Sequence, residues 1–389
     1  MSKIIYNFDT CLDRCATDSI KWRKFAADVL PMWVADMDFI SPEPVVRALR
    51  ERVEHGVFGY PQEPPELREL IVARMTERYH WQIQAEDIVF LPGVVGGFNL
   101  ACHSIALSGT DTLPGVLVQP PVYPPFLSAP AQAGLSRQEA ELVCNPDGSY
   151  SIDWESFEAA ITDQTRLFLL CNPHNPVGRV FRQDELAHMA EICLRRGVLI
   201  CSDEIHCDLV FPGHTHIPIA SLDTEIAQHT ITLMAPSKTF NIAGLECSYA
   251  IIQNAEIRQR YQDARHGLVS GVNMLGWVAA QAALRDGQDW LEQVLVYLQV
   301  NRDYLVDTLK DGFPSIKMVK PEGTYLAWLD CRGTGIENPY EFFLEKGRVA
   351  LFPGNYFGQG GAGFVRLNFG CPRAMLADAL QRMQAALNA

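Results

Sequence analysis

The chain has 389 residues, of which 48% are hydrophobic and 20% are charged, so it is long enough for two domains and apolar enough for large cores. Acidic residues outnumber lysine and arginine by 46 to 32, which gives a formal net charge of −14. A charge of this sign repels phosphate backbones and anionic membranes, so we expect no nucleic-acid partner and no membrane partner. The first residues lack the apolar stretch of a signal peptide, and no apolar run is long enough to cross a bilayer. We therefore expect a cytoplasmic protein.

Eleven cysteines are scattered through segments that otherwise have the composition of a protein core. The closest pair, Cys11 and Cys15, has no second pair of cysteines or histidines to complete a zinc site. An odd number of dispersed cysteines indicates free thiols, which behave as small hydrophobic side chains, in a reducing compartment. We expect no metal site.

Amphipathic segments alternate with short apolar runs over most of the chain, the pattern of helices that cover a mostly parallel sheet. The first strand is expected at Ile88–Leu91, directly before a glycine-rich segment that opens a helix. Residues 184–197 have an acidic start and a basic, glycine-capped end, which predicts a helix. Five further runs of strand length end in polar or turn-forming residues: Gly115–Val118, Arg166–Cys171, Gly197–Asp203, Thr230–Met234 and Tyr249–Ile252.

A long helical stretch follows over residues 273–310, and Gly287 marks a break within it. Beyond residue 314 the pattern changes to short strands at 324–329 and 364–369, with helices between and after them, which is typical of a smaller α+β domain. The segment up to about Pro44 has few helix signals, so we expect it to pack with that smaller domain.

These elements predict an α/β fold with two domains. The large domain is expected to span residues 46–286. The small domain is expected to combine residues 1–45 with residues 287–389.

Polar residues lie at the carboxyl ends of three of the predicted strands, at residues 172–178, 202–206 and 235–241. Because ligands gather at the carboxyl ends of parallel strands, we expect these residues to converge. Each cluster alone also fits a structural role, as a turn, a helix cap or a surface lysine. Lys238, however, lies in an apolar context, and a buried lysine has a lowered pKa and becomes a Schiff-base nucleophile.

With these motifs the sequence resembles the fold-type-I pyridoxal-phosphate enzymes, the aspartate aminotransferase superfamily, over essentially its whole length. Within that superfamily it resembles the cystathionine β-lyase (C–S lyase) branch of PatB and MalY type. The resemblance implies a large domain with a mostly parallel, seven-stranded sheet flanked by helices, a smaller α+β domain, and pyridoxal 5'-phosphate as cofactor. The segments that match are residues 33–39, 55–60, 202–206, 237–244, 323–330 and 364–372.

The resemblance also implies roles around the cofactor ring. Lys238 would bind the cofactor covalently and remove the Cα proton of the substrate, and Asp203 would pair with the protonated pyridine nitrogen. Asn175 would donate a hydrogen bond to the phenolic oxygen of the cofactor, and Tyr123 would stack on the ring. Many relatives have a tyrosine three residues after the aspartate, where this chain has His206. The histidine is typical of the MalY-type branch.

The phosphate group of the cofactor is expected at the glycine-rich segment after the first strand. There the backbone N–H groups of Val94 and Val95 open a helix, an arrangement that suits a phosphate, and Ser237 adds a hydroxyl. Many aminotransferases have a phosphate-binding arginine eight residues after the lysine, whereas this chain has Glu246. That carboxylate would repel phosphate, so either it points away or another group compensates.

Four further residues match positions near the substrate or the subunit interface. Arg366 matches the arginine that binds the substrate α-carboxylate with two parallel hydrogen bonds. Asp36 and Tyr325 match positions near the substrate, without a firm role. Tyr60 matches a tyrosine that reaches the phosphate of the neighbouring subunit, which implies a homodimer with shared active sites.

One motif is misleading. Gly358–Gly363 satisfies the G-x-G-x-x-G pattern, but a dinucleotide fingerprint needs a strand before it and a helix after it. The residues that follow are expected to form a strand, so we expect no nucleotide site there.

The resemblance implies a C–S β-lyase that cleaves cystathionine or related cysteine S-conjugates to a thiol such as homocysteine, pyruvate and ammonia. An aminotransferase for an amino acid is the first alternative, because it uses the same cofactor residues and differs only in the fate of the carbanion. A pyridoxal-phosphate-binding regulator that docks on a transcription factor is the second. His206 favours the lyase.

Overall fold

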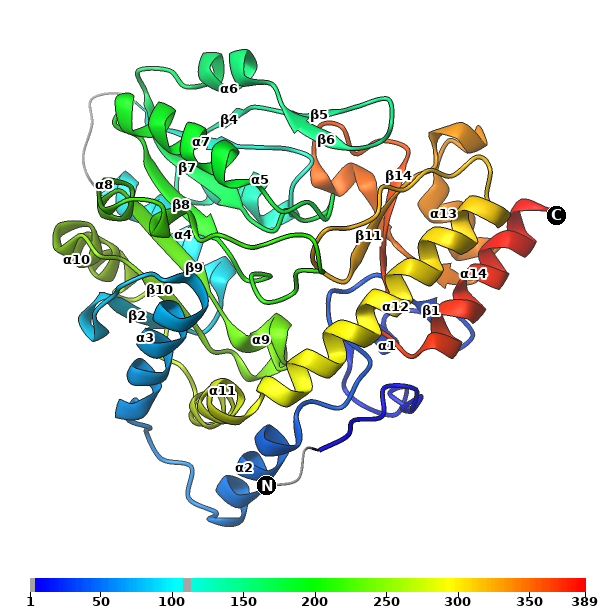
Figure 1. Cartoon of the computed structure of the whole chain (residues 1–389), viewed down its shortest axis with the longest axis horizontal. Helices are drawn as coiled ribbons and strands as arrows, with labels where there is room; N and C mark the ends of the chain where they lie inside the picture. Colours follow the sequence, from blue (N-terminus) through cyan, green and yellow to red (C-terminus); the bar gives the residue numbers. More distant parts are fainter. Residues whose placement is uncertain (1–3, 108–112) are drawn as a thin grey trace.

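A seven-stranded sheet forms the centre of the computed structural model, which describes residues 4–107 and 113–389 (Figure 1). The strand order is β2-β10-β9-β8-β7-β3-β4. β10 runs antiparallel to both of its neighbours, and the other strands run parallel to one another. The mostly parallel sheet is therefore confirmed. Its strands are β2 (Ile88–Leu91), β3 (Gly115–Val118), β4 (Ser136–Glu139), β7 (Thr165–Cys171), β8 (Leu199–Asp203), β9 (Thr230–Met234) and β10 (Ser248–Ile251).

Helices cover both faces of this sheet. α4, α5 and α10 pack on one face, and α6 and α7 pack on the other. Because both faces are covered, every residue of β2, β3, β9 and β10 is buried, which explains why these strands appear in the sequence as continuous apolar runs. The helices before residue 287 are α1 (Ile20–Arg23), α2 (Glu43–Glu54), α3 (Pro65–Tyr79), α4 (Val94–Ala106), α5 (Pro124–Gln132), α6 (Trp154–Ala160), α7 (Gln183–Arg195), α8 (Thr224–Gln228), α9 (Pro236–Thr239), α10 (Ala255–Arg265) and α11 (Met274–Asp286).

The long helical stretch is broken at Gly287, as predicted. α11 ends at Asp286, and α12 (Gln288–Gly312) begins directly after the glycine. A Cβ atom on Gly287 would lie 2.4 Å from the carbonyl oxygen of Ala283 and 2.7 Å from the ring of Phe240. The close approach of these atoms requires a glycine at the break.

A smaller antiparallel sheet, in the order β11-β14-β13, lies in the C-terminal part of the chain. β11 begins at Leu326, two residues later than predicted, because Thr324 has a φ angle of +68° and cannot continue a strand. Two small strand pairs, β1-β12 and β5-β6, complete the sheets. The strands and helices not yet given bounds are β1 (Leu30–Pro31), β5 (Leu142–Cys144), β6 (Tyr150–Ile152), β11 (Leu326–Asp330), β12 (Val349–Ala350), β13 (Phe352–Pro353), β14 (Phe364–Asn368), α13 (Pro339–Glu345) and α14 (Arg373–Leu387).

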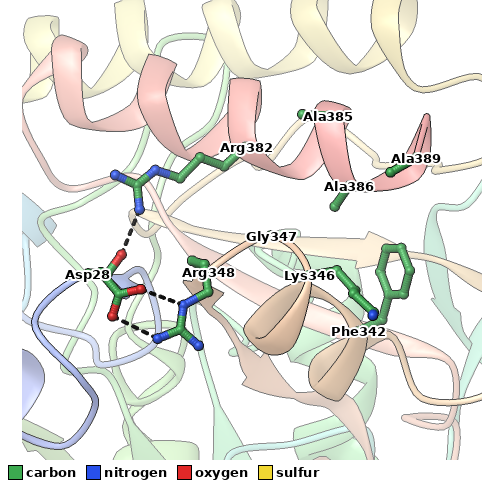
Figure 2. A pocket seen from close by; sticks show the side chains of 9 residues that line it. All are labelled: Asp28, Phe342, Lys346, Gly347, Arg348, Arg382, Ala385, Ala386 and Ala389. Carbon is green, nitrogen blue, oxygen red and sulfur yellow. Dashed lines mark hydrogen bonds and ion pairs between the residues drawn. The ribbon is translucent and has the colours of Figure 1, made fainter.

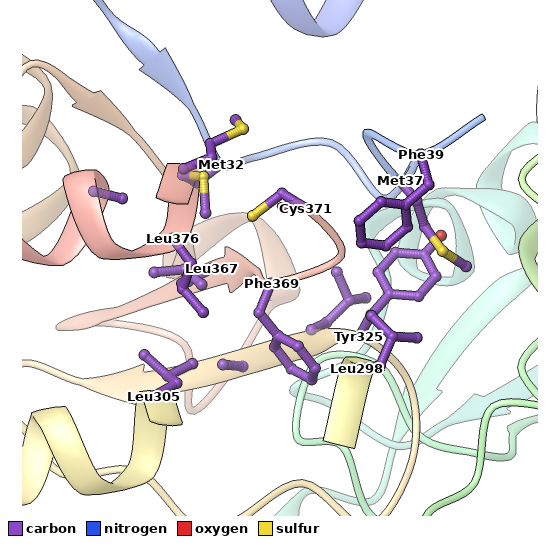
Figure 3. Close-up of a cluster of buried hydrophobic side chains, with 14 of the residues drawn as sticks. Met32, Met37, Phe39, Leu298, Leu305, Tyr325, Leu367, Phe369, Cys371 and Leu376 are labelled. Carbon is purple, nitrogen blue, oxygen red and sulfur yellow. The ribbon is translucent and has the colours of Figure 1, made fainter. Parts of the chain in front are cut away.

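The N-terminal segment packs on this C-terminal part. β1 pairs with β12 in parallel, and the blue N-terminal chain lies beside the orange and red elements in Figure 1. Met37 and Phe39 lie in one buried cluster with Leu298 of α12 and Phe369 (Figure 3). This contact agrees with the grouping of residues 1–45 with residues 287–389, although the exact domain boundaries stay a prediction.

Three smaller observations bear on the sequence analysis. Gly358–Gly363 is followed by the strand β14, so the helix of a dinucleotide fingerprint is missing. All eleven cysteines are free, and eight of them are buried. In the part of the chain that the structure describes, no helix is long and apolar enough to span a bilayer.

Candidate active site

A cavity of about 200 Å³ lies at the carboxyl ends of β7, β8 and β9. The backbone joins these strand ends directly, because Asn172 N–H donates to the Asp203 carbonyl and Glu204 N–H donates to the Leu233 carbonyl. The three polar clusters of the sequence therefore converge. Eight of the predicted residues line the cavity: Val94, Val95, Tyr123, Asn175, Asp203, His206, Ser237 and Lys238.

Lys238 lies on α9, a single helical turn that directly follows β9. Its Nζ donates a hydrogen bond to the carbonyl oxygen of Ala35, 2.5 Å away. Loss of water around the amine lowers the pKa of Lys238 to about 8, although Asp36 opposes this shift. A substantial fraction of the amine is therefore neutral near pH 8, as a nucleophile or a base requires.

Asp203 is the last residue of β8 and is 3% exposed. Burial raises the pKa of its carboxyl to about 7, because the N–H of Ile205 and the charge of Lys238 compensate only partly. A buried carboxylate of this kind is stabilised by a cation placed next to it. The site therefore fits the protonated pyridine nitrogen of a cofactor.

His206 lies on the loop after β8 and is fully enclosed. Burial lowers the pKa of its imidazole to about 3, and the charges of Lys238 and Arg366 lower it further, so the ring is neutral at physiological pH. Its Nδ1 has no hydrogen-bond partner among the described residues, and its ring meets the Tyr325 ring edge-on at 6.0 Å. The imidazole therefore retains an unused polar atom inside the site.

Arg366 projects from β14 and is 2% exposed. Its Nη1 donates to Asn175 Oδ1 at 3.0 Å and its Nη2 donates to the Trp33 carbonyl at 2.9 Å. Nε has no partner, and within residues 4–107 and 113–389 no carboxylate forms an ion pair with this guanidinium. Burial lowers the pKa of Arg366 to about 10. A buried cation without a counter-ion suits a carboxylate ligand.

The contact with Arg366 also orients Asn175. Because Oδ1 of the amide accepts a hydrogen bond from Arg366, its Nδ2 is left to donate to a group in the cavity. A phenolic oxygen of a bound cofactor would accept that hydrogen bond.

The N-terminal segment closes one side of the cavity through its backbone. The carbonyl of Ala35 accepts hydrogen bonds from Lys238 and, at 2.9 Å, from the hydroxyl of Tyr325. The neighbouring Asp36 forms ion pairs with Arg14 at 2.8 Å and with Lys21 at 3.4 Å. Tyr325 and Asp36 thus lie close to the lysine without lining the cavity, and their place near the substrate stays a prediction.

A buried ion cluster holds this segment in place. Lys21 is 1% exposed, and its Nζ lies 2.6 Å from the carboxylate of Asp38. Asp38 also accepts hydrogen bonds from Arg14 and from the indole of Trp22. Sequence analysis missed this cluster, because lysine is almost never fully buried unless it is paired.

Comparison with known proteins identifies the family. Residues 27–383 match the family described as aminotransferase class I and II. The chain belongs to the aminotransferase class I and II family.

Similarity to individual proteins shows where within this family the chain belongs. The chain is 41% identical to cystathionine beta-lyase PatB of Bacillus subtilis, over 98% of this chain and 100% of that protein. It is 33% identical to protein MalY of Escherichia coli, over 96% of each chain. The crystal structure of cystalysin from Treponema denticola, which contains pyridoxal 5'-phosphate, superposes with a TM-score of 0.93 at 34% identity and covers 99% of both chains. The resemblance to the PatB and MalY branch is therefore confirmed.

The part of the cavity where the cofactor phosphate is expected is only partly polar. α4 begins at Val94 beside Gly93, and both residues line the cavity together with Ser237. Glu246 also lines the cavity, although much of its surface is exposed to solvent. A carboxylate therefore stays at the site where many aminotransferases have an arginine.

In the described part of the chain, no group of three or more His, Cys, Asp or Glu residues is arranged to hold a metal ion.

Tyr60 does not line the cavity of its own chain. It lies fully exposed on the loop between α2 and α3. This position is compatible with a contact to a neighbouring subunit, and that contact stays a prediction.

A larger cavity, of about 740 Å³, lies against α13 and α14 (Figure 2). Asp28 stands between two arginines there: it accepts two hydrogen bonds from Arg348, at 2.7 and 2.8 Å, and its backbone carbonyl accepts one from Arg382 at 2.8 Å. None of the predicted site residues lines this cavity. The volume of a cavity alone therefore does not identify the active site.

Proposed function

We propose that this chain is a pyridoxal 5'-phosphate-dependent C–S β-lyase. It acts on cystathionine or a related cysteine S-conjugate and, with one water molecule, releases a thiol, pyruvate and ammonia. The observation that supports this most is the convergence of Lys238, Asp203 and Asn175 on one cavity, with Arg366 hydrogen-bonded to Asn175, in a chain that matches a cystathionine beta-lyase over its full length.

When bound, pyridoxal phosphate supplies an electron sink for the negative charge that develops at the substrate Cα. The residues of the chain supply the remaining functions. Arg366 binds the α-carboxylate and thereby directs the Cα–H bond toward Lys238. Lys238 accepts the Cα proton on Nζ, since its lowered pKa leaves the amine partly neutral. Asp203 keeps a proton on the pyridine nitrogen, and Asn175 donates to the phenolic oxygen.

The assay that tests this proposal follows products without a keto acid. Purified, cofactor-loaded protein is incubated with L-cystathionine, and pyruvate and free thiol are measured together. We expect both to be released in equal amounts, because β-elimination produces one of each.

The same assay separates the lyase from an aminotransferase. Absence of both products, with amino transfer only after a keto acid is added, would contradict the lyase and establish transamination. The Lys238→Ala variant, assayed in parallel, controls for products formed by free cofactor. No observation favours docking on a transcription factor, and we do not propose it.

We also propose that the protein is a homodimer with shared active sites. The loop between α2 and α3 exposes Val57, Phe58 and Tyr60, all more than half exposed in the single chain. Contiguous exposed apolar side chains of this kind are typical of interfaces. We expect light scattering to give twice the mass of the chain. A Phe58→Asp variant is expected to dissociate into monomers. A monomer with full lyase activity would contradict the shared active site.

The free thiols support a cytoplasmic location.

A further inference from the structure

The turn that presents Lys238 is too short to fix its own position. α9 has only four residues, and two backbone hydrogen bonds close it, from Phe240 N–H to Pro236 and from Ile242 N–H to Ser237, each 2.9 Å long. A single turn of helix is not stable without contacts to the surrounding protein. The location of the lysine amine therefore depends on what the following residues contact.

Thr239, the residue after the lysine, anchors the turn to the large domain. It is completely buried, and its Oγ1 donates a hydrogen bond of 2.8 Å to Oδ2 of Asp208. The other oxygen of Asp208 contacts Arg74 of α3 at 2.6 Å and Arg78 at 3.3 Å. Although burial alone would raise the pKa of Asp208, the two arginines hold it below its usual value, so the acceptor stays ionised.

Asn241 anchors the other side of the turn to the N-terminal segment. Its Oδ1 accepts a hydrogen bond from Met37 N–H at 2.9 Å, and its Nδ2 donates to the carbonyls of Met37 and Phe39 at 3.0 and 2.8 Å. Its φ angle is +55°, in the left-handed region where asparagine is enriched among non-glycine residues. Met37 lies two residues after Ala35, whose carbonyl faces the lysine amine.

These contacts join the lysine turn to two different parts of the chain. Thr239 is held by the loop after His206 and by α3, whereas Asn241 is held by the segment that supplies the Ala35 carbonyl. Phe240, between them, packs in the buried cluster against Trp290 of α12 at a ring distance of 6.3 Å. Among the four consecutive residues 238–241, Lys238 alone lines the cavity.

We propose that Thr239 and Asn241 are positioning residues, which hold the amine of Lys238 in place from two sides so that it meets the cofactor aldehyde and the substrate Cα. This inference rests on the proposed function, since it concerns the lysine of that site. Neither residue lines the cavity, so both act through the backbone of the turn.

The test measures how fast Lys238 binds the cofactor covalently. Cofactor is removed from the purified holoenzyme, pyridoxal phosphate is added back, and the absorption band of the lysine-bound cofactor is followed. Borohydride reduction and peptide mass spectrometry then identify the modified lysine. The variants form matched pairs: Thr239→Val removes the hydroxyl at nearly constant shape, and Thr239→Ser retains it. Asn241→Gly keeps the φ angle without the amide, and Asn241→Asp retains the Oδ1 acceptor.

We expect Thr239→Val and Asn241→Gly to bind the cofactor about tenfold more slowly, Thr239→Ser to stay within about twofold of the parent protein, and Asn241→Asp to lie between. In the lyase assay we expect kcat to rank the four variants in the same way. KM is expected to change by less than about twofold, because neither residue lines the cavity in which substrate would bind. Rescue by serine separates positioning from a general loss of structure.

Each outcome is decisive. Equal rates in Thr239→Val and Thr239→Ser, together with equal rates in Asn241→Gly and Asn241→Asp, would overturn the inference. If Thr239→Val does not fold, the Asn241 pair decides alone. If the parent protein carries no cofactor on Lys238 after reduction, the proposed function is wrong, whichever way the variants behave.

Discussion

Replacing Lys238 with alanine is expected to lower β-elimination by at least about 10⁴-fold, since the loss of a positioned acid–base group alone costs about 10²–10⁴-fold. The variant also loses the amine that holds the cofactor covalently. Neither His206 nor Arg366 can replace the lysine, because the pKa of His206 is lowered to about 3, which makes it a poor base, and Arg366 keeps its proton at physiological pH. The measurement is pyruvate release from L-cystathionine under single-turnover conditions.

Lys310→Ala is the matched control for this experiment. Lys310 lies exposed on α12 and does not line the cavity, so its removal is expected to leave turnover and cofactor binding unchanged. Borohydride reduction is expected to fix the cofactor in the control and not in Lys238→Ala. Any cofactor that Lys238→Ala retains is expected to be held only non-covalently, so a variant that carries the cofactor covalently after reduction would show that another lysine is the attachment point.

The convergence of the site could be predicted because it depends on simple rules of topology. Asp203 ends β8, Asn175 and Lys238 come shortly after β7 and β9, and these three parallel strands are direct neighbours. Residues placed just after neighbouring parallel strands lie at one edge of the sheet whatever the details of packing. The residue types at these positions then restrict the chemistry.

The other wall of the cavity could not be predicted in the same way. Its contacts come from backbone carbonyls of the N-terminal segment: that of Ala35 accepts from Lys238 and that of Trp33 accepts from Arg366, and any residue type supplies a carbonyl. Their direction is set by contacts more than 200 residues apart in the chain, such as those between Asn241 and Met37. A single sequence contains no local signal for such contacts.

Buried charges were missed for a related reason. Lys21 and Asp38 have the composition of surface residues, and only the tertiary structure places them within 2.6 Å of one another. The strand boundary at Leu326 differs from the prediction because Thr324 adopts a left-handed φ angle, which a β-branched residue rarely does. Strand propensity gives no warning of this conformation.

Replacing Asp203 with asparagine is expected to separate stability from function. In the cofactor-free protein the pKa of Asp203 is about 7, above the value of about 3.9 expected for an unfolded chain. Between these two pH values the folded state binds more protons than the unfolded state, so the free energy of unfolding falls as the pH rises. Above pH 7 the full cost of the buried charge is present, on the order of 2–4 kcal/mol. Asparagine removes that charge and retains an acceptor for the N–H of Ile205.

The cofactor-free Asp203→Asn protein should therefore be the more stable one at pH 8, and the difference should vanish near pH 4, as urea unfolding at several pH values measures directly. Turnover should change in the opposite direction and fall by about 10²-fold or more, because a neutral amide cannot keep the pyridine nitrogen protonated. Parallel stability curves for the two proteins from pH 4 to pH 8 would show that Asp203 is already compensated in the empty site. In that case its partner would belong to the chain, and the carboxylate would not be reserved for a cofactor. The expected gain in stability after losing the carboxylate is thus the clearest sign that Asp203 is placed for a bound cation and not for the fold.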